Sequence, residues 1–325
     1  MDPRKSGIAE APDPFEQNKK LGRGINIGNA LEAPKEGEWG VTVKEDFFRL
    51  IKEKGFNSVR IPVRWSNHAA LDGPYQIDTA FFKRIDEVID QALSRGLAVV
   101  INMHHYDDLM DSPAANKERF LALWRQISEH YANYTSNLFF EVLNEPNGNL
   151  TPEVWNSYLK EAISAIREKN PFRTLIIGGA DWDGIASMNS LSIPASEKNV
   201  IATVHYYDPF TFTHQGAEWV FASDLWLGTT WRATEAEKQA VMRDMELLLS
   251  WSKRNNRPVY IGEFGSYNKA DMESRANWTN FISRQAELRG FSWSYWEFCS
   301  GFGVFDPNKD EWNVPLIDAL IPAGV

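Results

Sequence analysis

The chain repeats one local pattern along most of its length: a short apolar run, a polar loop and then an amphipathic segment. The apolar runs are rich in Val and Ile and are nearly continuous, which is typical of parallel strands buried on both faces. Eight such runs occur, at residues 24–29, 58–63, 97–103, 138–144, 174–179, 200–206, 258–264 and 291–298. Buried parallel strands that alternate with helices predict an α/β fold, a closed (β/α)8 TIM barrel.

The segments between these runs carry helix signals. Residues 78–96 begin at an Asp that can cap a helix and end at a Gly, and residues 151–170 begin with Thr151 followed by Pro152. An open doubly wound sheet is the competing arrangement. The glycines of residues 22–30 lie before or within the first strand and lack GxGxxG spacing, so the barrel is favoured.

The length and the absence of a linker predict one catalytic domain over residues 1–325, with residues 1–14 as a flexible N-terminal extension. The first 20 residues have no apolar stretch of the kind found in signal peptides. We therefore expect a monomer that is secreted and has lost its signal peptide, with a cytoplasmic location as the alternative.

Composition excludes several classes of function. A net charge of −10 disfavours a nucleic-acid partner, because binding polyphosphate needs a basic patch. The single cysteine, Cys299, offers neither a disulfide framework nor a Cys-based zinc site. No apolar run approaches the roughly 18 residues of a membrane span. We expect no nucleic acid, no membrane partner and no cofactor.

Active sites of TIM barrels lie at the C-terminal ends of the strands, and polar and aromatic residues gather there. These positions are Asn29, Glu32, Arg60, His104, His105, Tyr106, Asn144, Glu145, Asp181, Trp182, His205, Tyr206, Tyr207, Glu263, Trp296 and Glu297. Contact with water explains a single acid at a strand end. It does not explain several His, Glu and Trp residues together.

Glu145 and Glu263 lie at the ends of the fourth and seventh strands, so they are expected to face each other across the mouth of the barrel. Two opposed carboxylates can hydrolyse a glycosidic bond, one as acid/base and the other as nucleophile or water activator. Like charge and partial burial should raise the pKa of one of them. A cation such as Arg60 would keep the other ionised.

The order of short motifs along the chain resembles glycoside hydrolase family 5, and within it the endo-β-1,4-glucanases of thermophilic bacteria. The motifs are VRIPVRW at 59–65, NMHHY at 102–106, LNEP at 143–146, TVHYY at 203–207, GEFG at 262–265 and YWEF at 295–298. The resemblance extends over about residues 15–305.

The resemblance implies a retaining mechanism in which Glu145 is the acid/base and Glu263 the nucleophile. It implies that Arg60 aligns Glu263 and that Asn144 hydrogen-bonds the sugar 2-hydroxyl.

The remaining residues that the resemblance implies are aromatic. His104, with His105 beside it, would line the subsite on the non-reducing side, and His205 would support Glu145. Tyr207 would lie near the nucleophile, and Trp296 would form the stacking floor under the distorted sugar.

Two other charged groups have plainer interpretations. Glu141 lies within the fourth strand and is predicted to form a structural ion pair with Arg60 or Arg64. Adjacent residues of a strand point to opposite faces, so His104 and His105 cannot easily bind one metal ion. We therefore expect no metal.

Residues 205–231 form the longest connection, and loops of this length are usually functional. We predict that Trp219, with His214 nearby, borders the product-side subsites, and that Asn29 and Glu32 bind a sugar hydroxyl on the opposite side. The plainer alternative is a small satellite core formed by Phe210, Phe212 and Phe221.

The resulting hypothesis is an endo-acting hydrolase of β-1,4-glucosidic bonds in cellulose and mixed-linkage β-glucan, with β-glucan or glucomannan as the polysaccharide partner. A β-1,4-mannanase or a dual cellulase/mannanase is the alternative. A catalytically silent glucan-binding barrel is disfavoured, because a binder does not need two opposed acids. A metal-dependent hydrolase is disfavoured, because the two acids already have an explanation without a metal.

Overall fold

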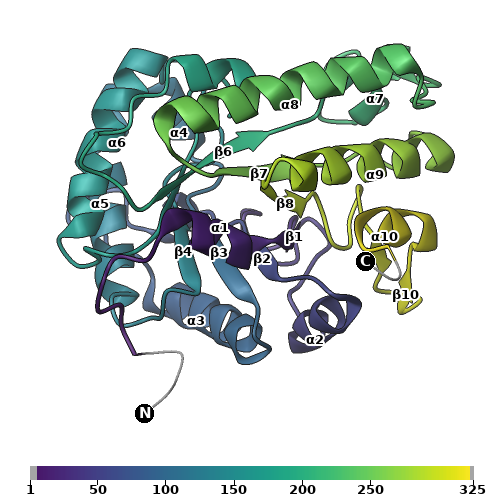
Figure 1. Cartoon of the computed structure of the whole chain (residues 1–325). Helices are drawn as coiled ribbons and strands as arrows, with labels where there is room; N and C mark the ends of the chain where they lie inside the picture. The colour runs from purple at the N-terminus through teal and green to yellow at the C-terminus, as the bar shows by residue number, and fades with distance from the viewer. Residues whose placement is uncertain (1–5, 323–325) are drawn as a thin grey trace.

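The computed structural model describes residues 6–322 and shows a closed barrel of eight parallel strands in sequence order (Figure 1). Each strand pairs with the next along the chain, and the first pairs with the last. The predicted fold is therefore confirmed. The strands are β1 (Arg23–Asn26), β2 (Ser58–Ile61), β3 (Ala98–Asn102), β4 (Leu138–Glu141), β5 (Leu175–Ile177), β6 (Val200–His205), β7 (Val259–Phe264) and β8 (Ser292–Tyr295).

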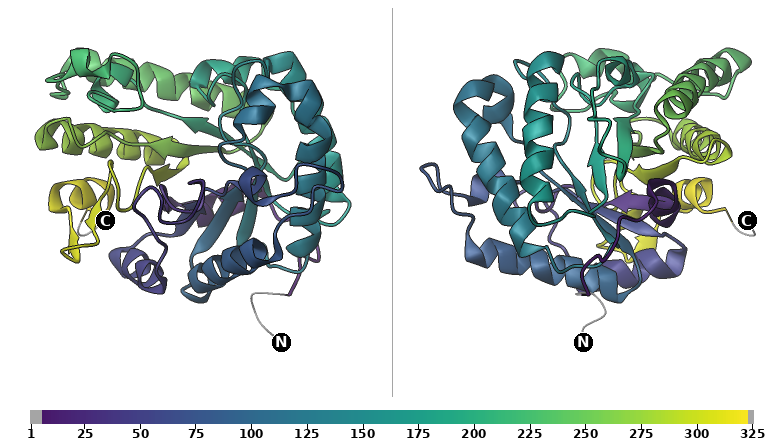
Figure 2. Two further views of the ribbon diagram at one scale, coloured as in Figure 1. Left: turned by 180° about the vertical axis from the view of Figure 1, so that it is seen from behind. Right: turned by 60° about the vertical axis from the view of Figure 1, so that its left-hand side comes forward.

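Helices surround the barrel on its outside (Figure 2). The predicted caps form, since the Asp78 carboxylate accepts the Ala80 N–H and the Thr151 hydroxyl accepts the Val154 N–H. The helices are α2 (Glu45–Lys54), α3 (Thr79–Ser94), α4 (Asp107–Asp111), α5 (Pro113–His130), α6 (Pro152–Arg167), α7 (Phe210–Thr213), α8 (Glu235–Asn255), α9 (Met272–Leu288) and α10 (Val314–Leu320). Shorter elements are the 3-10 helices η1 (Trp65–His68), η2 (Ile185–Asn189) and η3 (Ser223–Trp226) and the hairpin strands β9 (Phe305–Asp306) and β10 (Glu311–Trp312).

Side chains of the strands pack into two separate apolar cores, one outside the barrel and one inside it. Val59 and Ile61 of β2 belong to the large core between the barrel and its helices. The barrel interior has its own apolar layer, which includes Val100 and Phe139. Arg60 of β2 has the interior parity and is 0% exposed. A buried cation at this place needs partners, which the site provides.

A helix that the sequence patterns did not predict closes the N-terminal end of the barrel. Helix α1 (Pro14–Leu21) is capped by Asp13, and its last residue, Leu21, packs into the interior apolar layer. Of the expected flexible extension, residues 1–5 lie outside the described part. Residues 6–13 contain neither helix nor strand, but the Gly7 N–H donates to the Asn133 carbonyl at 2.8 Å.

The fourth strand is shorter than predicted. The ladder of β4 ends at Glu141, and Glu145 lies four residues further, in the loop, with a left-handed φ of 46°. The Asn144 N–H still donates to the Met103 carbonyl at 2.9 Å. An apolar run continues past the ladder because residues at the barrel mouth are also buried, so the run alone overestimates the strand.

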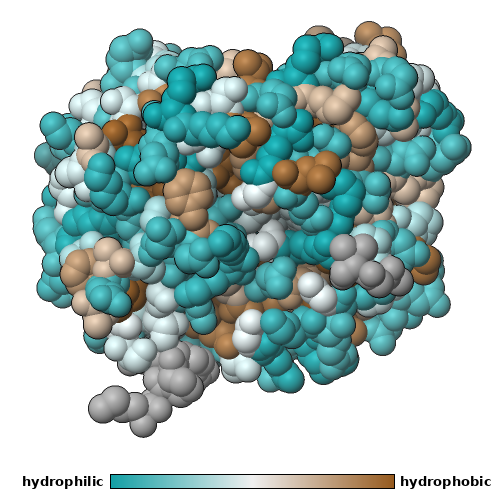
Figure 3. Space-filling view, in the orientation of Figure 1, coloured by the Kyte–Doolittle hydropathy of each residue, from teal (hydrophilic) through white to brown (hydrophobic). Residues whose placement is uncertain are grey.

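The face shown in Figure 3 is mainly hydrophilic, with apolar residues scattered over it. Within residues 6–322, the structure has no helix that is both long enough and apolar enough to cross a membrane.

Candidate active site

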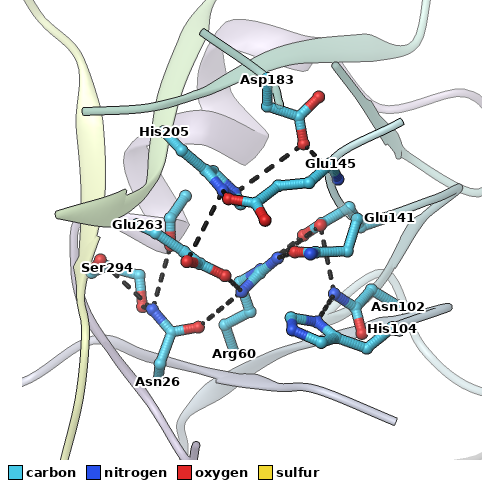
Figure 4. Close-up of polar contacts among 12 residues, drawn as sticks. Asn26, Arg60, Asn102, His104, Glu141, Glu145, Asp183, His205, Glu263 and Ser294 are labelled. Atoms are coloured by element: carbon cyan, nitrogen blue, oxygen red, sulfur yellow. Dashed lines mark hydrogen bonds and ion pairs between the residues drawn. The ribbon is translucent and has the colours of Figure 1, made fainter. Parts of the chain in front are cut away.

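Arg60 is the centre of a buried polar network at the C-terminal end of the barrel (Figure 4). Its guanidinium donates to both oxygens of Glu141, at 2.7 and 2.6 Å. It also donates to Glu263 at 2.6 Å, to Asn26 at 2.8 Å and to Asn144 at 2.6 Å. A buried charge is tolerated when it is paired and hydrogen-bonded in this way. The guanidinium therefore connects β1, β2, β4 and β7 in one rigid unit.

The predicted ion pair of Glu141 with Arg60 is confirmed. Glu141 is 0% exposed and also accepts a hydrogen bond from Asn102 at 3.2 Å. The other candidate partner, Arg64, pairs instead with Asp107 at 2.8 Å.

Glu145 and Glu263 both lie near the same ring nitrogen of His205. The imidazole Nδ1 is 2.7 Å from a Glu145 oxygen and 3.6 Å from a Glu263 oxygen. One oxygen of each carboxylate lies within 4.8 Å of the other. The Tyr207 hydroxyl donates to Glu263 at 2.8 Å. Glu263 is held by more donors and is only 6% exposed at its side chain, against 24% for Glu145.

The surroundings of His205 favour its protonated form. Burial lowers the pKa of His205, but the charge of Glu263 and the hydrogen bond with Glu145 outweigh it and raise the pKa to about 9. Burial raises the pKa of Glu145, but the hydrogen bond and charge of His205 outweigh it and bring the pKa below its usual value. Burial raises the pKa of Glu263, and the charges of His205 and Arg60 offset this only in part. Of the two carboxyl groups, Glu263 thus has the raised pKa. The family resemblance assigns the role of acid to the other one, Glu145.

Aromatic rings form the side of the site near β3 and β8. His104 is 2% exposed, and its ring lies parallel to that of Trp296 at 6.0 Å between centroids. Burial and neighbouring His105 bring the pKa of His104 well below its usual value. Trp296 packs directly over Gly28, where a Cβ atom would come within 2.9 Å of the indole. A glycine is therefore required under the predicted stacking floor. His105 lies edge-on to Trp39 at 5.6 Å.

The first loop uses its acid internally. The Glu32 carboxylate is 1% exposed and accepts the backbone N–H groups of Asn29 and Ala30. Asn29 is half-buried with a left-handed φ of 62°. The Glu32 carboxylate therefore orders the first loop. Sugar binding by Asn29 and Glu32 stays a prediction.

The long loop is only partly folded onto the barrel. Phe212 is 0% exposed, whereas Phe210 is 41% and Phe221 is 96% exposed, so the satellite-core interpretation holds for Phe212 alone. Trp219 is 61% exposed and lies 6.5 Å from the ring of His214. Whether this tryptophan contacts product-side sugars stays a prediction.

Two buried residues of the site were missed by the sequence reasoning. The Asn26 amide donates to the Gly262 carbonyl at 3.0 Å and supports Arg60 from below. Asp183 accepts the Glu145 N–H at 2.8 Å. Strand parity could have indicated Asn26. Asp183 follows two residues that were noted at the fifth strand end, but no local pattern places it under Glu145.

Glu145, His205 and Glu263 also satisfy the geometry of a metal-binding group, since one ligand atom of each lies within 4.8 Å of the others. The His205 Nδ1 that would bind an ion is shared with Glu145, and Arg60 and Tyr207 already donate to Glu263. The donor set thus has partners within the protein.

A (β/α)8 barrel with two opposed carboxylates and stacking aromatics at its mouth has the architecture of a glycoside hydrolase. The sequence profile described as Cellulase (glycosyl hydrolase family 5) matches residues 20–301. The chain belongs to this family.

Several characterised proteins are similar to this chain. It is 43% identical to Endoglucanase H of Acetivibrio thermocellus over 98% of its own length. It is 58% identical to the endoglucanase Cel5A of Thermotoga maritima, with a TM-score of 0.94, covering 95% of this chain and 100% of that one. A hyperthermophilic endo-β-1,4-glucanase solved with substrate is 44% identical, also with a TM-score of 0.94, covering 95% of this chain and 99% of that one. The chain spans 35% of Endoglucanase H and 37% of Cellulase/esterase CelE of the same organism.

Proposed function

We propose that this protein is an endo-β-1,4-glucanase that cleaves internal bonds of cellulose and mixed-linkage β-glucan with retention of configuration. The observation that carries the proposal is that one oxygen of Glu145 lies within 4.8 Å of one oxygen of Glu263. Retaining enzymes hold these groups about 5–5.5 Å apart, whereas inverting enzymes need about 6.5–9.5 Å to admit a water molecule between them. The short separation supports double displacement.

Glu263 suits the role of nucleophile. Arg60 and Tyr207 each donate to one of its oxygens, which orients the carboxylate and stabilises its anion. In the first step a Glu263 oxygen bonds the anomeric carbon while the glycosidic C–O bond breaks. In the second step water replaces Glu263 at that carbon and the carboxylate is restored.

Glu145 suits the role of acid/base. As the glycosidic oxygen departs, Glu145 takes the Nδ1 proton from His205 and passes it to that oxygen, and it later accepts a proton from the attacking water. The lowered pKa of Glu145 in the free protein fits this sequence, because the proton is stored one hydrogen bond away. Asn144 has its amide oxygen engaged by Arg60, so its N–H group is the donor offered to the sugar 2-hydroxyl.

The substrate class follows from exposed indoles at the same end of the barrel. Trp39, Trp182 and Trp219 are 39%, 58% and 61% exposed, and indole faces bind sugar rings. Thermotoga maritima Cel5A has been crystallised with cellobiose and with mannotriose. A primary mannanase activity is not favoured, because the similar proteins are named endoglucanases. Since a long polymer is degraded outside the cell, we propose an extracellular location.

The substrate is tested by initial rates on barley β-glucan, carboxymethyl cellulose, glucomannan, galactomannan and xylan. We expect the highest rate on β-glucan, with a rapid fall in viscosity that shows internal cleavage. A highest rate on galactomannan or xylan would overturn the proposed specificity.

The roles of the two acids are tested with a dinitrophenyl β-cellobioside in the presence of azide. Glu145→Ala should yield the β-glycosyl azide, because azide attacks the intermediate on Glu263. Glu263→Ala should yield the α-azide. The opposite pair of products would reverse the assignment.

A further inference from the structure

Asp183 lies behind the proposed acid/base, at the end of an unusual loop turn. Three consecutive residues, Asp181, Trp182 and Asp183, have left-handed φ angles of 77°, 58° and 52°. Non-glycine residues rarely adopt this conformation, and such residues concentrate at functional sites. The turn exposes Asp181 and Trp182 to solvent and buries Asp183 completely.

Asp183 holds both partners of the Glu145–His205 pair. Its Oδ2 accepts the Glu145 N–H at 2.8 Å, and Glu145 itself is left-handed. Its backbone carbonyl accepts the backbone N–H of His205 at 2.9 Å. Its Oδ2 is also 3.9 Å from the His205 Nε2, as the dashed line in Figure 4 shows. Both reacting partners are thus positioned from one residue.

Two buried polar atoms of this group have no hydrogen-bond partner among the described residues: Oδ1 of Asp183 and Nε2 of His205. The carboxylate packs onto Gly178, where a Cβ atom would come within 1.9 Å of Oδ1. A buried acid that lacks full hydrogen bonding is costly to stability. The buried position of the Asp183 carboxyl group is therefore better explained by its electrostatic effect on the site than by a contribution to stability.

We propose that Asp183 is a positioning residue for the acid/base, which fixes Glu145 through its backbone N–H and places a carboxyl group behind His205. The imidazole then lies between two carboxyl groups, with Nδ1 2.7 Å from Glu145 and Nε2 3.9 Å from Asp183. This inference rests on the proposed function, because it explains how Glu145 obtains its proton.

The groups that face His205 come from several elements. They are Glu145 after β4, Asp183 after β5 and Glu263 on β7, all acidic, with the cation Arg60 on β2 and the neutral His104 after β3 further away. Burial raises the pKa of Asp183 well above its usual value, and the charge of His205 offsets this only in part. The two groups are nevertheless coupled, since the charge of each favours the charged form of the other.

The test is Asp183→Asn, with Asp181→Asn as the matched control in the same left-handed turn. Asn tolerates left-handed φ and keeps an oxygen for the Glu145 N–H, so the substitution removes mainly the ionisable carboxyl group. The value of kcat/KM is measured against pH on β-glucan, whose leaving group needs an acid, and on 2,4-dinitrophenyl β-cellobioside, whose leaving group does not.

For Asp183→Asn we expect the alkaline limb of the β-glucan profile to move to lower pH by about one unit. We expect the neutral-pH rate on β-glucan to fall about tenfold or more, while the activated substrate changes little and Asp181→Asn matches wild type. Equal losses on both substrates, or an unmoved limb, would show a merely structural residue and overturn the proposal.

A measurement on the wild-type protein keeps the proposal testable if Asp183→Asn does not fold. Nitrogen NMR should find both His205 ring nitrogens protonated at pH 7. A neutral imidazole would overturn the proposed arrangement of His205 between Glu145 and Asp183. A wild-type protein inactive on every β-glucan would instead refute the proposed function, whatever the state of His205.

Discussion

The most informative perturbation is Glu141→Gln, because Glu141 shares Arg60 with the proposed nucleophile but does not face the substrate. The carboxylate receives two hydrogen bonds from Arg60 and one from Asn102. A Gln side chain has one oxygen and presents its NH₂ group to donors on the other side. We expect a large loss of stability with little loss of turnover.

The magnitude follows from the burial of the pair. Removing one partner of a buried ion pair costs about 3–5 kcal/mol. Because Gln keeps one acceptor, about 3 kcal/mol is expected, which corresponds to a fall in melting temperature of about 4 °C in a chain of this size. Arg60 retains Glu263, Asn26 and Asn144, so turnover per folded molecule should stay within about threefold, under 1 kcal/mol in the barrier.

The assay pairs a thermal melt with kcat on β-glucan at a temperature well below the transition. Asp46→Asn is the control, because its ion pair with Arg49 lies on the surface, with side chains 58% and 38% exposed. Such pairs contribute about 0–1 kcal/mol, so this variant should melt close to wild type. An unchanged melting temperature in Glu141→Gln, or a loss of turnover at full stability, would refute the reasoning.

Three further predictions concern catalysis, pH and metal. Glu145→Gln should lower kcat/KM on β-glucan by about 10²–10⁴-fold, and Glu263→Gln at least as much, with folding unchanged by circular dichroism; full activity in either would contradict the pair. Burial raises the pKa of Glu32 to about 8 and of Glu297 to about 7. Because these pKa values are higher than in the unfolded chain, the free energy of unfolding falls as the pH rises above the unfolded-state pKa. The raised pKa of His205, about 9, acts in the same direction, because its stabilising proton is lost as the pH rises. The melting temperature should therefore fall between about pH 5 and pH 9, and a maximum in the alkaline range would contradict this. Dialysis against EDTA should leave activity unchanged, and a loss restored by added metal would show that the carboxylates bind an ion.

The sequence by itself was enough to establish the barrel and the end of it that carries the site. The alternation of buried apolar runs with capped helices is local, and a local period survives without any knowledge of contacts. Because the C-terminal ends of parallel strands share one face, placing Glu145 and Glu263 at the ends of strands was enough to bring them together. Strand parity also predicted a buried ion pair for Glu141 with Arg60 or Arg64, and the structure shows that Arg60 is the partner.

Other features required the tertiary structure. Helix α1 is short, and its sequence has only a weak helical pattern of apolar residues. Its role becomes clear only from its contact with the apolar layer inside the barrel. Asp183 reaches Glu145 only because three successive residues adopt left-handed angles, which no residue type there requires. The order of pKa values could likewise not be predicted, since it depends on both acids lying close to one nitrogen of His205. Residue spacing along a chain determines which face a side chain occupies. Which atoms then share a proton depends on the stagger of the strands and the turns of the loops, and these are set by the fold as a whole.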